Sequence, residues 1–121
     1  MVSMRLFTRA DEQQFVPSLE SSCSIYCAFE SNILVGYCIF RYEDSFVILT
    51  DLVTTPPDIA LADGLARAAI AAAASRMKEF VRLMNSYELD LFAANLKIFG
   101  DNTAKVEDVL ATTLCNTSFG G

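Results

Sequence analysis

The sequence predicts a single α/β domain, residues 1–121, in which an antiparallel meander of strands leads to a crossover helix, a fourth strand and a second helix. Three observations predict it. Residues 22–53 read as strands joined by short turns, residues 58–75 read as an alanine-rich helix after a Pro-Pro break, and residues 80–98 read as a strand followed by a helix. A chain of 121 residues that is 53% hydrophobic has enough apolar material for one core.

The meander consists of three expected strands. Residues 22–29 alternate with a period of two, whereas residues 33–42 and 46–53 are almost continuously apolar or aromatic. Turn-forming residues separate them at 30–32 and 43–45. The continuous apolar content of the second and third strands indicates burial on both faces, so we expect helices to cover this sheet.

The crossover helix is expected from Asp58 to about Ser75. Asp58 follows two prolines that end the third strand, and its side chain is suited to the N-cap position. Asp63 and Arg67 have the spacing of a favourable i,i+4 ion pair, which we place on the solvent side. The many alanines of this segment allow the helix to lie close to the sheet.

The chain then continues as a fourth strand and a second helix. The strand is expected at residues 80–84, and the helix at residues 87–98 with Asn85 or Ser86 as its N-cap. Gly100 is expected to end this helix as a C-cap glycine.

The two ends of the chain carry weaker signals. Residues 4–7 are expected as a short strand, and residues 10–19 as a short helix that Pro17 stops. Residues 104–106 are expected to add a strand, and residues 107–114 one or two helical turns.

The charge balance argues against two classes of partner. Nine Lys and Arg against 15 Asp and Glu give a net charge of -6, which repels nucleic acid and anionic membranes. We find neither a run of about 20 apolar residues nor a secretory signal, and therefore expect a cytoplasmic protein.

The four cysteines, Cys23, Cys27, Cys38 and Cys115, do not have the spacing of a metal site, and the chain has no histidine. We expect the first three to act as small hydrophobic residues within strands. The missing histidine also excludes Ser-His and Cys-His catalytic pairs.

The order of elements over residues 22–100, including the strand end LTDLVTTPP before a capped helix, resembles the GNAT acyltransferase superfamily. In that family a Gln/Arg-x-x-Gly-x-Gly/Ala loop holds the pyrophosphate of coenzyme A on backbone amides at a helix N-terminus. Here Ile59 stands at the Gln/Arg position, and Ala62 and Gly64 stand at the small positions. The resemblance implies an acetyl-CoA or other acyl-CoA cofactor. It would be held by the amides of Ala62, Asp63, Gly64 and Leu65.

The resemblance also implies a catalytic base. Many members carry an acidic residue on the fourth strand of the family fold, and Asp51 lies in the matching segment. Burial would raise its pKa toward the value that a base needs near neutrality. Alternatively, Asp51 pairs with Arg41 or with backbone amides. The tyrosine that serves as general acid in the family is matched here by Leu96, and Tyr87 lies more than two helical turns earlier.

Most of the N-terminal half that shapes the acceptor pocket in this family is missing from residues 1–21. Because that would leave apolar strand surface uncovered, we expect a homodimer with two-fold symmetry. Three hypotheses remain: an acyl-CoA-dependent N-acyltransferase with an unknown amine acceptor, a non-catalytic GNAT-derived module for oligomerisation or ligand sensing, and an unrelated small α/β adaptor.

Overall fold

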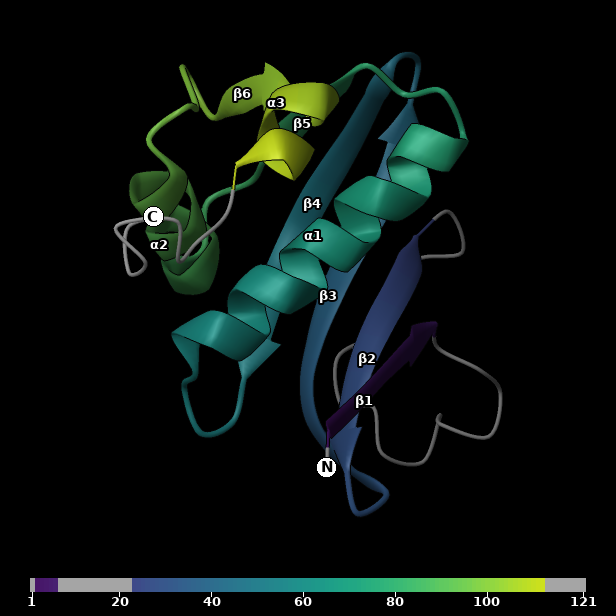
Figure 1. The fold of residues 1–121 in the computed structure, drawn as a ribbon, viewed down its shortest axis with the longest axis vertical. Helices are drawn as coiled ribbons and strands as arrows, with labels where there is room; N and C mark the ends of the chain where they lie inside the picture. Colours follow the sequence, from purple (N-terminus) through teal and green to yellow (C-terminus); the bar gives the residue numbers. More distant parts are fainter. Residues whose placement is uncertain (1, 7–22, 113–121) are drawn as a thin grey trace.

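In the computed structural model of the chain, residues 2–6 and 23–112 are described, and they form a six-stranded sheet with helices packed on one face (Figure 1). The strands lie in the order in which they follow one another in the chain. Neighbouring strands are antiparallel except β4 and β5, which are parallel. The strands are β1 (Val2–Leu6), β2 (Ser24–Glu30), β3 (Ile33–Glu43), β4 (Phe46–Thr54), β5 (Phe80–Leu83) and β6 (Thr103–Lys105).

The helices are α1 (Ile59–Ser75), α2 (Tyr87–Leu96) and α3 (Val106–Ala111). α1 runs diagonally across β2, β3 and β4 and forms the crossover between the parallel strands β4 and β5 (Figure 1). α2 and α3 pack beside α1. The predicted α/β class and the meander, crossover helix, fourth strand and second helix are therefore confirmed. No helix within the described ranges is both long and apolar enough to cross a membrane.

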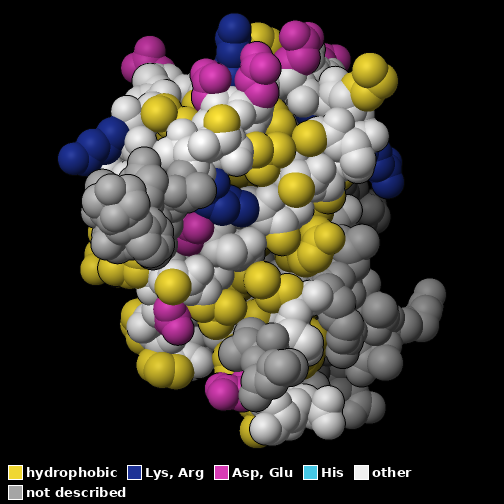
Figure 2. Space-filling model, viewed as in Figure 1, with side chains coloured by type: hydrophobic (Ala, Val, Ile, Leu, Met, Phe, Trp, Pro, Cys, Tyr) yellow, Lys and Arg dark blue, Asp and Glu magenta, His cyan; other side chains and the backbone are white. Residues whose placement is uncertain are grey.

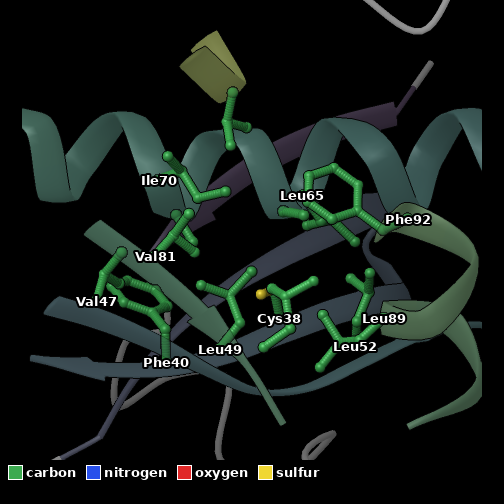
Figure 3. Packing of buried hydrophobic residues seen from close by; sticks show 14 of the residues in the cluster. Cys38, Phe40, Val47, Leu49, Leu52, Leu65, Ile70, Val81, Leu89 and Phe92 are labelled. Carbon is green, nitrogen blue, oxygen red and sulfur yellow. The ribbon is translucent and has the colours of Figure 1, made fainter. Parts of the chain in front are cut away.

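The main core lies between the sheet and these helices. Figure 3 shows side chains from β3 and β4, among them Phe40 and Leu49, meeting Leu65 and Ile70 from α1. All four are at most 1% exposed. Burying an aliphatic or aromatic side chain of this size stabilises the fold by about 1.5–3 kcal/mol, so this contact fixes α1 on the sheet.

Gly36 on β3 allows the close approach of α1. A Cβ atom at this position would lie 3.0 Å from Leu65 Cδ1 and 3.0 Å from the carbonyl oxygen of Val53. Real Cβ atoms very rarely approach other heavy atoms so closely. Any larger residue at this position would therefore force Leu65 or the backbone of β4 to shift by a few tenths of an ångström.

A second, smaller cluster lies on the opposite face of the sheet and contains Ile25, Cys27, Phe29 and Ile39. Cys27 is buried in this cluster, and Cys38 is buried in the main core. Cys23 packs against the second cluster as a free thiol. Cys27 and Cys38 thus act as small hydrophobic residues within strands, as predicted, whereas Cys23 precedes β2 and is only half-buried. Cys115 and the expected helix at residues 10–19 lie outside the described residues.

The end of α2 differs from the prediction. α2 ends at Leu96, and Lys97 is its C-cap in the left-handed conformation with φ 60°. Gly100 instead exchanges two 2.9 Å backbone hydrogen bonds with Thr103. These bonds close a tight turn through Asp101 and Asn102, whose φ angles of 51° and 60° suit a hairpin. Gly100 therefore begins the hairpin into β6 rather than ending α2.

The position of the Asp63–Arg67 pair also differs from the prediction. The ion pair forms, with Nε 2.8 Å from Oδ2, but the side chains are only 13% and 18% exposed. The reason is α3, which packs on this side of α1 and whose Val109 carbonyl accepts a 2.8 Å hydrogen bond from Arg67 Nη1. The pair thus joins α1 to α3 and does not face solvent.

Candidate functional site

The two parallel strands part after four residue pairs. β4 and β5 are paired from Phe46 with Phe80 to Leu49 with Leu83, and the Met84 amide donates one further 2.9 Å bond to the Leu49 carbonyl. β4 then continues to Thr54, whereas the chain after β5 turns away into α2. A bulge in the pairing of β3 with β4 lies at the same level, since the register shifts between Ile39 and Phe40. The edge of β4 over residues 50–54 thus faces α2 and not another strand.

Two amides on this open edge of β4 are bonded to carboxylates. The Leu52 amide donates to Asp51 Oδ1 at 2.9 Å, and the Thr54 amide donates to Glu88 Oε2 at 2.9 Å. Glu88 Oε1 also accepts a 2.7 Å hydrogen bond from the Thr54 hydroxyl. Because Glu88 belongs to the first turn of α2, this side chain fills the place beside β4 that a strand would otherwise occupy.

The N-terminus of α1 lies next to this opening. The Asp58 amide donates to the Thr54 hydroxyl at 2.8 Å, and Asp58 Oδ1 accepts from the Leu61 amide at 3.0 Å. The predicted N-cap is therefore confirmed. The next two amides, of Ile59 and Ala60, have no acceptor within the part of the chain that the structure describes. Such amides at a helix N-terminus attract anions.

A cavity of about 190 Å³ lies between the start of α1 and the first turns of α2. Its apolar side chains include Ile59, which is 54% exposed, and Tyr87, which is 74% exposed. On the face of the molecule shown in Figure 2, the lower part carries hydrophobic side chains with Asp and Glu side chains among them. The cavity is thus an apolar hollow bordered by negative charge. Its lining consists of Pro57, Asp58, Ile59, Ala62, Tyr87, Glu88 and Leu91.

A larger cavity of about 350 Å³ lies at the other end of α1, between Ala74, Phe80 and α3. It does not adjoin the open edge of β4. Lys78, one of its two lysines, donates to the Asp44 carbonyl and lies over the Tyr42 ring. We therefore place the candidate functional site at the smaller cavity.

Asp51, the predicted base, is half-buried and is the cross-strand partner of Ile39. This places it on the sheet face opposite α1. The predicted alternative of a bond to a backbone amide occurs at Leu52. Burial raises the pKa of the Tyr37 hydroxyl, and the negative charges of Asp51 and Glu88 raise this pKa further. Tyr37 pairs with Val53, two residues along β4 from Asp51, so both side chains lie on this face of the sheet.

The four residues expected to hold the coenzyme lie in the first two turns of α1. Among them only Ala62 lines the cavity, and its amide already donates to the Asp58 carbonyl at 2.9 Å. The Asp63 carboxylate points to Arg67, and Leu65 is fully buried in the core. Gly64 lies beneath Met4, whose Cε would be 3.5 Å from an added Cβ. Their role in coenzyme binding stays a prediction.

Sequence reasoning missed Glu88 and Thr54. An acidic residue in the first turn of a helix is usually explained by the helix dipole, so Glu88 gave no separate signal. Thr54 was noted only as part of the segment before the two prolines. Their contact joins residues 34 positions apart and depends on the tertiary fold.

The site thus consists of an opening between two parallel strands of an α/β sheet, beside a helix N-terminus, and open α/β sheets commonly bind ligands at such a place. No protein-family model matches the chain, and no curated protein matches its sequence. Solved structures do match. A ribosomal-protein-alanine N-acetyltransferase from Brucella melitensis biovar Abortus 2308 matches with a TM-score of 0.66 and 15% identity, over 78% of this chain and 90% of that one.

Two further structures match in the same way. A GNAT-family acetyltransferase from Staphylococcus aureus MU50 has a TM-score of 0.66 and 8% identity, over 88% of this chain and 99% of that one. The PaiA N-acetyltransferase from Thermoplasma acidophilum, solved with coenzyme A, has a TM-score of 0.55 and 15% identity, over 69% and 61%. The chain therefore has the GNAT acetyltransferase fold, as the resemblance in its sequence implied.

Proposed function

We propose that this chain binds an acyl coenzyme A at the opening between β4 and α2 and transfers the acyl group to an amine. The observation that carries the proposal is the parting of β4 from β5 directly beside the N-terminus of α1. This notch lies in a fold shared with acetyltransferases, and the matching structure from Thermoplasma acidophilum was solved with coenzyme A.

The residues present offer such a ligand backbone donors and an apolar surface for part of its length. The amides of Ile59 and Ala60 can hold phosphate oxygens, and the apolar cavity walls can cover the pantetheine arm. The β4 edge can pair with the amide groups of that arm, as a sheet edge pairs with an extended peptide. The carboxylates of Asp58 and Glu88 weaken the attraction for phosphate, so we expect modest affinity.

The coenzyme would supply a thioester carbonyl, and the chain would supply a base. Asp51 lies on the sheet face away from α1, so an amine could approach the opening from that face. Its carboxylate would take a proton from the ammonium group of the acceptor, and the free amine would then attack the thioester carbonyl and release the thiolate of the coenzyme. Tyr37 lies beside it and keeps its proton to higher pH, because its pKa is raised. A phenol in that state can donate a hydrogen bond to the departing sulfur.

A non-catalytic GNAT-derived module for ligand sensing or oligomerisation is the alternative. The observation in its favour is that the Leu52 and Thr54 amides are already bonded to carboxylates of the chain. With either function, we still predict a homodimer and a cytoplasmic location.

Thermal unfolding in the presence of acetyl-CoA tests binding. A ligand at a hundred times its dissociation constant stabilises a protein by about 2.7 kcal/mol, which shifts the Tm of a domain of this size by several degrees. We expect a saturable increase in Tm, and a much smaller one with acetyl-pantetheine, which lacks the pyrophosphate. No increase at millimolar acetyl-CoA would refute the proposal.

Thiol release from acetyl-CoA in the presence of a panel of amines tests transfer. We expect Asp51→Asn to bind acetyl-CoA as the unmodified chain does and to lose at least about 100-fold in kcat, the usual contribution of a general base. Binding without release for every amine would favour the non-catalytic alternative.

A further inference from the structure

Glu88 occupies the point on β4 where an extended ligand would first meet the strand. Its two oxygens accept from the Thr54 amide at 2.9 Å and from the Thr54 hydroxyl at 2.7 Å. Thr54 is 3% exposed, so these two donors have little access to water while Glu88 is in place. Glu88 also lines the cavity between α1 and α2.

A ligand carbonyl needs the same donor. The Thr54 amide lies on the β4 edge that faces away from β3, where an amide-containing chain would pair with the strand. A carboxylate that accepts two hydrogen bonds is a stronger acceptor than a neutral carbonyl. The side chain of Glu88 therefore stands where such a ligand carbonyl would bind.

We propose that Glu88 is a built-in competitor that sets the affinity and selectivity of this site, and that an acyl coenzyme A binds only as the Glu88 side chain swings away from Thr54. This inference rests on the proposed function, since it concerns the same ligand. The inference assigns to Glu88 a role in specificity that the proposed function does not assign to Asp51 or to the residues at the start of α1.

The surrounding bonds allow this movement. The Thr54 hydroxyl would lose its acceptor but would still accept from the Asp58 amide at 2.8 Å, so the start of α1 keeps its anchor. Asp51, in contrast, belongs to β4 itself and bonds the amide of its own neighbour Leu52. Glu88 comes from α2, and a rotation of its side chain leaves β4 unchanged.

Charge strengthens the competition. Glu88 and Asp58 both border the cavity in which phosphate oxygens would meet the amides of α1. Moving one carboxylate away as the ligand enters reduces repulsion at the moment when the pyrophosphate arrives. Ligands without a carbonyl to replace the carboxylate at Thr54 gain nothing from the movement, and this difference is the source of selectivity.

Calorimetric titration with coenzyme A tests the inference. We expect Glu88→Ala to bind at least about tenfold more tightly than the unmodified chain, because the ligand no longer displaces a charged hydrogen-bond acceptor. Asp90→Ala removes an exposed carboxylate from the same turn of α2 and is the matched control, for which we expect a change within about twofold. Circular dichroism verifies that both variants are folded.

Glu88→Gln separates charge from occupancy. The glutamine keeps the size and one acceptor oxygen, so we expect its affinity to fall between those of the unmodified chain and Glu88→Ala. Equal affinities for the glutamine and alanine variants would show a charge effect alone and would overturn the inference. Unchanged or weaker binding by a folded Glu88→Ala would also overturn it, while leaving the proposed function intact.

A second measurement does not depend on any variant. In the unmodified chain, the amide resonance of Thr54 should shift on saturation with coenzyme A as its acceptor changes from carboxylate to ligand. Saturation without a shift at Thr54 would overturn the inference. Failure of both the unmodified chain and Glu88→Ala to bind coenzyme A would refute the proposed function, and with it the inference.

Discussion

The Glu88 carboxylate holds Thr54 through two atoms, accepting from its backbone amide and from its hydroxyl. Thr54 in turn accepts from the Asp58 amide, and Asp58 caps α1 through Leu61. One continuous set of hydrogen bonds therefore connects the first turn of α2, the end of β4 and the start of α1. Two of these residues, Asp58 and Glu88, also border the cavity of the candidate site.

Removing the Thr54 hydroxyl should destabilise the fold. In Thr54→Val the Asp58 amide loses its acceptor and Glu88 loses a donor, in a place that is almost fully buried. We expect a loss of about 1–3 kcal/mol in the free energy of unfolding by urea. Thr55→Val, at an exposed neighbouring position, is the control and should change it by less than about 0.5 kcal/mol. Equal losses in the two variants would contradict the assigned role of the hydroxyl.

The two glycines beside α1 should respond to alanine in opposite directions. At Gly36 a Cβ would press on Leu65 and on the Val53 carbonyl at 3.0 Å, so we expect Gly36→Ala to cost about 1–3 kcal/mol. At Gly64 it would meet only the Met4 side chain, at 3.5 Å or more, inside a helix. We expect Gly64→Ala to stabilise the fold by about 0.5–1 kcal/mol. Thermal unfolding measures both, and a stabilising Gly36→Ala would show that α1 does not lie so close to β3.

Elements with local signals were predictable from the sequence. The strand before the two prolines and the helix after Asp58 depend on residues close together in the chain, and both were placed within one residue of their bounds. The end of α2 was not, because Lys97 adopts the left-handed conformation that the sequence suggested for a glycine. Gly100 instead pairs with Thr103 in an antiparallel bridge, and this pairing could not be predicted from the glycine alone.

The candidate site was less predictable than the fold, because it depends on contacts between distant segments. The pairing of β3 with β4 shifts register between Ile39 and Phe40, and the apolar residues of β4 do not reveal this bulge. The bond between Glu88 and Thr54 requires α2 to pack beside the strand end, and single-sequence patterns carry no information about that packing. Asp51 was predicted as a base from the family resemblance, which places an acidic residue on this strand, and its role stays a prediction.

The Tyr37 hydroxyl should report on its neighbours. Burial raises its pKa, and the negative charges of Asp51 and Glu88 raise it further. The chain has four tyrosines and no tryptophan, so an ultraviolet titration, assigned with Tyr37→Phe, can follow this phenol. We expect it to titrate above the ordinary tyrosine pKa of about 10, and Asp51→Asn to lower its pKa. An unchanged Tyr37 pKa in Asp51→Asn would show that the Asp51 charge does not act on the Tyr37 hydroxyl.

The sign of the effect on stability follows from the same pKa. Above about pH 10 the phenol of Tyr37 in the unfolded chain loses its proton while the folded chain keeps it, so folding stability falls as pH rises through this range. The Cys38 thiol, whose pKa is also raised by burial and by Asp51, contributes a fall of the same sign from about pH 9. Tyr37→Phe should therefore lose less stability between pH 9 and about pH 11 than the unmodified chain, as measured by urea unfolding.

The amides proposed to hold the pyrophosphate can be tested with three variants at the start of α1. Ile59→Pro removes an amide that has no acceptor among the described residues, and proline is well tolerated there because Asp58 is extended. Ile59→Ala removes the same side chain but keeps the amide, so it is the matched control. Gly64→Ala tests the position that the sequence resemblance assigned to close phosphate approach.

We expect Ile59→Pro to bind coenzyme A about tenfold more weakly than Ile59→Ala, which corresponds to one lost charge-assisted hydrogen bond of about 1.4 kcal/mol. We expect Gly64→Ala to leave the dissociation constant unchanged within about twofold, because its amide lies within the α-helical hydrogen-bond pattern and its Cα lies beneath Met4. The reverse result, weaker binding by Gly64→Ala with equal binding by the two Ile59 variants, would assign the pyrophosphate to residues 62–65. Because Gly64→Ala should also raise the Tm, a loss of affinity in that variant could not be attributed to unfolding.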